Sequence, residues 1–179
     1  MRYVCQQRGE LIEYRCTQDT RRRIMRNAIM KNAMAAVLTV IAVAAQAAPM
    51  PYDEHADAAA DVRQALSAAQ AQHKQVLLVF GANWCPDCRE LDKALHGSSQ
   101  SLIQGRFEVV KVDVGNFDKN LELASQYGDP IKKGIPAAVV LSADNHIEYS
   151  TKGGELANAR RMGEQGIYDF LSSHVVTAH

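Results

Sequence analysis

The sequence QVLLVFGANWCPDC, residues 75–88, holds most of the local information about how this chain folds. Its first six residues form a continuous apolar run with β-branched members, which indicates a buried central strand. Gly81 and the residues after it turn the chain. Pro86 then fits the first turn of a helix, where its missing N–H has no partner to lose. The stretch therefore predicts a strand that runs into a helix, with Cys85 at the helix start and Cys88 one turn inside.

Apolar patterns on both sides of this stretch predict the other elements of the fold. Residues 51–74 form an Ala-rich amphipathic helix pattern, with Asp53 as its expected N-cap. The last two strands are expected to form a hairpin, and Gly163 and Gly166 interrupt the pattern of the final helix. The order of elements predicts an α/β fold with three layers, α/β/α, in which helices cover both faces of a mixed sheet. Downstream of residue 97, the patterns predict a short helix or turn at 98–104, strands at 107–113, 137–142 and 146–151, and helices at 118–127 and about 155–172.

The composition of the whole chain hides two unlike segments. The 179 residues are 47% hydrophobic, which suits a globular core, and 20 basic residues balance 20 acidic ones. Zero net charge excludes a generally basic nucleic-acid-binding protein, so no nucleic acid is expected as a partner. Residues 1–48, however, contain eight Arg or Lys residues and only three acidic ones. This basic segment is therefore expected to be a targeting sequence rather than part of the fold.

An uncharged run at residues 33–45 follows the basic residues and ends at the A-x-A site Ala45-Gln46-Ala47. As a helix it would rise about 20 Å, which is too short for a hydrocarbon core of about 30 Å. This pattern predicts an upstream extension or start-site artefact at 1–24, a signal peptide at 25–48 and a folded domain at 49–179. We expect an exported protein, periplasmic in a Gram-negative bacterium and otherwise secreted, without stable membrane insertion after processing. General export is preferred, and twin-arginine export is the alternative.

Cysteine spacing points to a reactive dithiol. Cys5 and Cys16 lie in the leader, which leaves Cys85 and Cys88 in the domain with C-x-x-C spacing. A bridge across two residues constrains the unfolded chain very little, so a purely structural disulfide is the weaker interpretation. A zinc site needs further ligands at suitable spacing, and the six scattered histidines supply none, so no metal is expected.

With Trp84 before the cysteine pair, and the strand–helix context around it, the chain resembles the thioredoxin family. Gly134-Ile135-Pro136 before the third strand and Gly153-Gly154 after the hairpin strengthen the resemblance, which covers roughly residues 70–175. It implies the thioredoxin fold, with a central four-stranded mixed sheet and an extra N-terminal helix. It also implies a thiol–disulfide oxidoreductase with no cofactor beyond the redox-active Cys85–Cys88 disulfide.

The two cysteines are expected to have different roles. Cys85, at a helix N-terminus where unpaired N–H groups stabilise an anion, should be the exposed attacking thiolate. Cys88 should be the resolving cysteine that breaks the mixed disulfide. The resemblance implies a cis bond before Pro136 and a substrate groove beside the cysteines. The residues expected to bind substrate there are Trp84, Pro86, Asp87, Ile135, Pro136 and Gly153.

Two departures from the family affect the expected chemistry. Val79 occupies the position where the family often buries a carboxylate, so water or Lys111 is expected to take the proton of Cys88. Asp87, expected to be a solvated residue in the first helical turn, places a negative charge beside the thiolate. Together with Ile135, which resembles the reductants of the family, Asp87 favours reduction of protein disulfides.

The expected partners are protein disulfide substrates and an unidentified electron-donor protein, either soluble or membrane-borne. The alternative interpretation is a non-catalytic thioredoxin-fold module that binds a protein partner or a metal through the same groove. The intact C-x-x-C pair counts against this alternative, because binding alone does not require both thiols.

Overall fold

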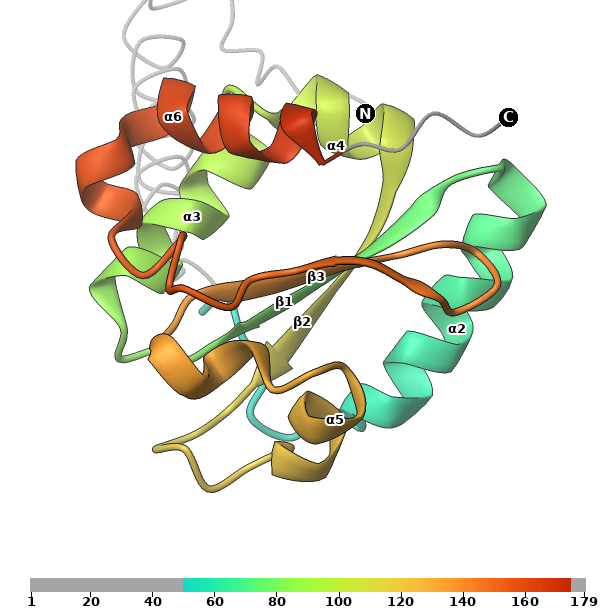
Figure 1. Cartoon of the computed structure of the whole chain (residues 1–179), viewed down its shortest axis with the longest axis horizontal. Coiled ribbons are helices and arrows are strands. Elements are labelled where there is room, and N and C mark those ends of the chain that lie inside the picture. Colours follow the sequence, from blue (N-terminus) through green and yellow to red (C-terminus); the bar gives the residue numbers. More distant parts are fainter. Residues whose placement is uncertain (1–49, 175–179) are drawn as a thin grey trace, which may run out of the picture. The chain divides into compact units, whose positions relative to one another are not determined.

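The structure, a computed structural model, describes residues 50–174 (Figure 1). The predicted upstream extension at 1–24 and signal peptide at 25–48 lie outside these residues. Within residues 50–174, no helix has the length and apolar character needed to cross a membrane. The described elements, in chain order, are α2 (Ala58–Gln72), β1 (Gln75–Gly81), α3 (Pro86–His96), α4 (Gln100–Arg106), β2 (Phe107–Asp113), α5 (Leu121–Gln126), the 3-10 helix η1 (Pro130–Lys133), β3 (Ala137–Leu141), β4 (Ile147–Ser150) and α6 (Ala159–Ser173).

The four strands form one mixed sheet in the order β2-β1-β3-β4. β1 pairs in parallel with β2, with Leu78 opposite Val110, and antiparallel with β3, with Leu78 opposite Val139. β3 and β4 form the predicted hairpin. All seven residues of β1 are buried, as its continuous apolar run predicts for a central strand. The thioredoxin fold and its four-stranded mixed sheet are confirmed.

Side chains of β1 alternate between two apolar clusters, one on each face of the sheet. Val76, Leu78 and Phe80 pack on one face with α2 and α5, whereas Leu77 and Val79 pack on the other with α3, α4 and α6. Figure 1 shows α3 and α6 side by side on one side of the sheet, with α2 on the opposite side. This alternation follows from the period of two in a strand, and it gives the predicted three layers.

The N-cap predicted for the first helix is wrong. Asp57, rather than Asp53, caps α2, because its carboxylate accepts a hydrogen bond from Ala60 N–H at 2.9 Å. The Asp53 carboxylate accepts from His55 N–H at 2.9 Å and so holds a turn before the helix.

Two other helices begin later than predicted. α5 begins at Leu121 rather than 118, because Phe117 and Asn120 adopt positive φ values of 65° and 53°, which a helix does not allow. α6 begins at Ala159 rather than 155. The Glu155 carboxylate accepts hydrogen bonds from the preceding backbone and holds a turn there instead. Of the two interruptions predicted for α6, the one at Gly163, whose φ is 67°, is confirmed, whereas Gly166 is helical.

Candidate active site

The two cysteines lie at the corner between the central strand and the first helix after it. β1 ends at Gly81, and α3 begins at Pro86, so Cys85 is the N-cap residue of α3. Its Sγ accepts a hydrogen bond from Cys88 N–H at 3.2 Å and forms a disulfide with Cys88 Sγ. Because the first N–H groups of a helix have no partner inside it, this position favours a negative charge on Cys85.

Exposure differs between the two cysteine residues less than the sequence suggests. Cys88 is fully buried, whereas Cys85 keeps 4% of its surface exposed. Cys85 was expected to be exposed, and the structure corrects this. The loop before β3 packs over the residue, with the Ile135 carbonyl oxygen 3.7 Å from Cys85 Sγ. Cys85 is still the more exposed of the two residues.

The loop before β3 forms one wall beside the cysteines. The Ile135–Pro136 bond is cis, as predicted. Both residues are buried, and the Ile135 side chain belongs to the same apolar cluster as Cys85 and Cys88. Sequence reasoning therefore placed this loop correctly beside the cysteines.

Of the two glycines after the hairpin, Gly154 rather than Gly153 lies close to the segment that precedes this loop. Gly153 is exposed, and its N–H donates to the Glu155 carboxylate at 3.0 Å. Gly154 has a φ of 79°, and a Cβ added to it would lie 3.0 Å from the Lys133 carbonyl oxygen. The glycine that the close approach of the two loops requires is therefore Gly154 rather than Gly153.

Two exposed aromatic rings pack together near the motif, those of Trp84, which directly precedes Cys85, and of Phe117. Trp84 is 53% exposed, and its indole Nε1–H donates to the Gly115 carbonyl at 2.8 Å, which fixes the ring. The Phe117 ring lies 6.3 Å from the Trp84 ring, between centroids, and Phe117 is 42% exposed. Sequence reasoning missed Phe117. Its signal was an aromatic residue among the polar residues of the loop that follows Asp113.

Asp87 is not the solvated residue that the sequence predicted. Its carboxylate accepts hydrogen bonds from the Arg160 backbone N–H at 3.0 Å and from the Arg160 guanidinium at 3.2 Å. Burial alone would raise the pKa of Asp87, but these hydrogen bonds, with the charges of Arg160 and Arg161, outweigh burial and lower the pKa. Asp87 therefore joins α3 to the start of α6, and Arg160 partly neutralises the charge beside the cysteines. Pro86 is exposed at the first position of α3.

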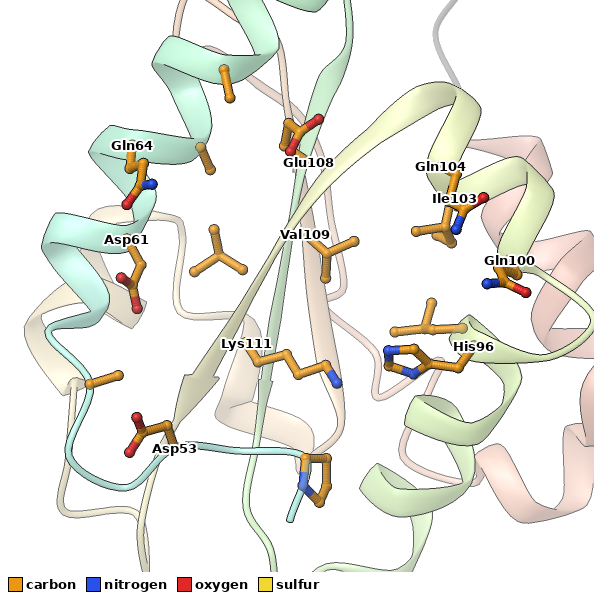
Figure 2. A pocket seen from close by; sticks show the side chains of 16 residues that line it. Asp53, Asp61, Gln64, His96, Gln100, Ile103, Gln104, Glu108, Val109 and Lys111 are labelled. Carbon is orange, nitrogen blue, oxygen red and sulfur yellow. The ribbon is translucent and has the colours of Figure 1, made fainter. Parts of the chain in front are cut away.

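Lys111, one expected proton acceptor for Cys88, is already engaged. Its ammonium pairs with the Asp92 carboxylate on α3. Lys111 also lines a hollow of about 810 Å³ along β2, and none of the lining residues is a cysteine (Figure 2). Polar side chains of α2, such as Gln64, border it on one side and those of α3 and α4, such as His96 and Gln100, on the other. Among residues 50–174, no group of three or more His, Cys, Asp or Glu side chains is arranged to hold a metal ion.

Sequence reasoning also missed Tyr52 and Asn83. Tyr52, before α2, is 2% exposed and packs in the cluster that contains both cysteines. Asn83, just before the motif, donates to the Tyr52 carbonyl at 2.8 Å and accepts from Tyr52 N–H at 3.0 Å. No sequence pattern links two residues so far apart, so only the folded chain brings them together.

Known proteins resemble this chain to different degrees, and one of them shares much of its sequence. The family description "thioredoxin-like" matches residues 57–143. A crystal structure of a disulphide isomerase from Xylella fastidiosa Temecula1 is 61% identical, covers 71% of this chain and 98% of its own, and has a TM-score of 0.69. A thioredoxin from Thermus thermophilus is 25% identical over 63% of this chain and 79% of its own, with a TM-score of 0.43. The reduced C-terminal domain of DsbD from Neisseria meningitidis is 22% identical over 65% of this chain and 96% of its own, with a TM-score of 0.43. No curated protein matches the chain.

Proposed function

Since this chain belongs to the thioredoxin family, we propose that it is an exported thiol–disulfide oxidoreductase that reduces protein disulfides through Cys85 and Cys88. One observation carries the proposal. Cys85 Sγ caps α3, accepts the Cys88 N–H and forms a disulfide with the buried Cys88. A free cysteine has a pKa of about 8.5, so a reactive thiol at neutral pH needs this kind of stabilisation of its thiolate.

The reduced protein would act in two exchange steps. The Cys85 thiolate attacks one sulfur of a substrate disulfide, and the other substrate sulfur leaves as a thiolate that takes up a proton. The Cys88 thiol then loses its proton, and its thiolate attacks Cys85 Sγ. The bond between Cys85 and the substrate breaks, the second substrate sulfur leaves, and the Cys85–Cys88 disulfide forms. The substrate gains two electrons, and the protein loses two.

Groups around Cys85 suit a protein substrate. The Ile135 carbonyl oxygen, 3.7 Å from Cys85 Sγ, lies where the backbone of an extended chain could pair with it. Trp84, which directly precedes Cys85, and Phe117, whose ring packs against that of Trp84, present exposed aromatic surface. A partner with apolar side chains next to its disulfide fits this surface.

Continued turnover requires a second partner. Each cycle leaves the Cys85–Cys88 disulfide, so an electron-donor protein, soluble or membrane-borne, must reduce it again. We propose no further cofactor, because the two thiols supply both electrons. A balanced overall charge makes nucleic acid an unsuitable partner.

The name of the Xylella relative supports a second candidate, disulfide isomerisation. An isomerase also attacks through its first cysteine, but the substrate's own thiols then rearrange the disulfides and no net reduction occurs. The two candidates therefore differ in the number of disulfides that remain in the substrate.

The reduced protein, mixed with an equal amount of a protein that contains one native disulfide, is expected to remove about one substrate disulfide per Cys85–Cys88 dithiol. Titration of substrate thiols and mass analysis would measure this. A scrambled substrate with several disulfides is the control. Recovery of its native pairing without loss of disulfides would favour isomerisation, whereas no change in either substrate would favour the non-catalytic binding module.

Export is expected to remove the leader. Expression of the whole chain in a Gram-negative bacterium should give a periplasmic product that begins at Ala48 or Pro49, because the A-x-A site Ala45-Gln46-Ala47 suits a signal peptidase. N-terminal sequencing of the periplasmic protein would test this. Replacement of Ala45 and Ala47 by bulky residues is the matched control and should block processing. A mature product that retains Arg26 would contradict the prediction.

A further inference from the structure

Cys88 is buried, and neither Val79 nor Lys111 is free to stabilise its thiolate. Burial raises the pKa of a thiol, because it disfavours the charged form. Cys88 is fully buried, yet it must become a thiolate to attack Cys85. Val79 offers no polar group, and the Lys111 ammonium already pairs with Asp92. Cys88 therefore needs another hydrogen-bond donor near its sulfur.

The Tyr52 hydroxyl lies near the Cys88 sulfur, beside Gly81. A Cβ added to Gly81 would collide with the Tyr52 hydroxyl oxygen and would lie 3.0 Å from Cys88 Sγ. The hydroxyl and the sulfur therefore both lie close to the point where a side chain of residue 81 would begin, and Gly81 leaves that point free. Any larger residue at position 81 would collide with the Tyr52 ring.

Asn83 fixes Tyr52 in this place. It binds both the N–H and the carbonyl of Tyr52, as a neighbouring strand would, and it also donates to the Glu54 carboxylate at 3.0 Å. Asn83 precedes Trp84 and Cys85 directly, so the same short loop carries the attacking cysteine and the anchor of Tyr52. A ring held at its backbone and buried on all sides has little freedom to turn away from Cys88.

The surroundings keep the Tyr52 hydroxyl protonated. Burial raises the pKa of Tyr52, and the negative charges of Asp92 on α3 and Asp113 on β2 raise it further. Lys111 pairs with Asp92, and Lys119 pairs with Asp113 at 3.1 Å, so both carboxylates are held in place. A phenol in this setting donates a hydrogen bond and does not act as a base.

We propose that Tyr52 is a positioning residue whose hydroxyl donates a hydrogen bond to the Cys88 thiolate during resolution of the mixed disulfide. The donor stabilises the thiolate that forms when Cys88 loses its proton to solvent. That thiolate then attacks Cys85 Sγ, and the substrate sulfur leaves with the electron pair of the broken bond. The catalytic part of the inference rests on the proposed function, but the effect on the Cys88 thiol does not.

The first test needs no substrate. In the reduced whole chain that carries Cys85→Ser, the rate of alkylation at Cys88, followed by peptide mass analysis across pH, reports the pKa of this thiol. Tyr52→Phe removes only the hydroxyl and is expected to raise this pKa by about one unit, since a hydrogen bond to a charged group is worth about that much. An unchanged pKa would overturn the proposal.

Tyr127→Phe is the matched control. Tyr127 is also buried, and its hydroxyl donates to Asn145 Oδ1 at 3.0 Å, so the variant removes a buried hydroxyl that is bonded elsewhere. It should leave the Cys88 pKa unchanged. A similar shift in both tyrosine variants would show a general loss of packing and would also overturn the proposal. Thermal unfolding of each variant would establish that it folds.

The second test measures resolution directly. With both cysteines present, Tyr52→Phe should form the mixed disulfide at the wild-type rate but resolve it about tenfold more slowly at neutral pH. The deficit should shrink as the pH rises and Cys88 ionises without help. Wild-type protein that never forms a mixed disulfide would defeat the proposed function, and the alkylation test would still decide the role of Tyr52. Resolution at the wild-type rate in Tyr52→Phe would defeat only the inference.

Discussion

Cys85→Ser is expected to abolish disulfide exchange, whereas Cys88→Ser should accumulate stable mixed disulfides with its substrates. Cys85 caps α3 and is the more exposed of the two residues, so we expect the first attack to depend on it. Cys88 is fully buried and can act only after Cys85 has captured a substrate. Loss of the attacking thiolate removes the nucleophile of the first step, and loss of the resolving thiol leaves that step intact.

Two measurements separate these roles. Non-reducing gels and mass analysis would detect trapped substrates in Cys88→Ser, and Cys85→Ser under the same conditions is the matched control. Alkylation of the reduced wild-type protein should modify Cys85 faster than Cys88. Equal alkylation rates, or trapping by Cys85→Ser instead of Cys88→Ser, would contradict the assigned order. A purely structural disulfide would give two unstable variants and no trapped substrate.

The second large effect concerns the reduction potential of the dithiol. Known dithiol proteins span roughly −270 mV for a reductant to −120 mV for a strong oxidant, and the strong oxidant owes its value to a stabilised reduced form. We expect a value of roughly −270 to −200 mV here. Asp87 places a negative charge two residues from Cys85, which disfavours the thiolate and makes the protein more reducing.

Arg160 modifies this expectation. Its guanidinium lies 3.2 Å from the Asp87 carboxylate, so part of the negative charge is neutralised. Asp87→His should raise the potential by tens of millivolts, since about 30 mV corresponds to a tenfold change in the equilibrium constant for two electrons. Arg160→Met should lower it by a smaller amount, because it leaves the Asp87 charge in place and removes its partner. The Arg160 backbone N–H, which also binds Asp87, remains in that variant.

Equilibration with glutathione buffers would measure each potential. Lys93→Met is a control, because Lys93 is an exposed cation at the other end of α3, and its loss should leave the potential unchanged. A wild-type value near −120 mV that Asp87→His does not move would refute the argument. Equal shifts in the Lys93 and Arg160 variants would show a response to net charge rather than to the Asp87–Arg160 pair.

Local sequence patterns determined the strands and the strand–helix corner that holds Cys85 and Cys88. The apolar run from Gln75 predicts β1, and the stretch 107–113 predicts β2 with the bounds that the structure has. Strand and helix periods depend on neighbouring residues only, so a short stretch contains this information. The same holds for Cys85 and Cys88 at the start of α3, because Pro86 marks the first helical turn. The sequence also determined the position of the Ile135–Pro136 loop, through its resemblance to the family.

Only the tertiary structure decided what surrounds the two sulfurs. Asp87 binds Arg160 across 73 residues, and Asn83 binds Tyr52 across 31 residues, and neither pairing leaves a periodic mark in the sequence. The helix starts were displaced by side-chain contacts and by positive φ values at residues that a pattern treats as helical, such as Asn120. A hydrophobic pattern shows which residues of one helix or strand face the core. A charged group or a hydrogen-bond donor instead acts on any group that the folded chain brings within a few ångströms of it. The strand–helix corner that holds Cys85 and Cys88 therefore follows from the local sequence. The effects that we expect from Arg160 on the reduction potential and from Tyr52 on the Cys88 thiol depend on the folded chain.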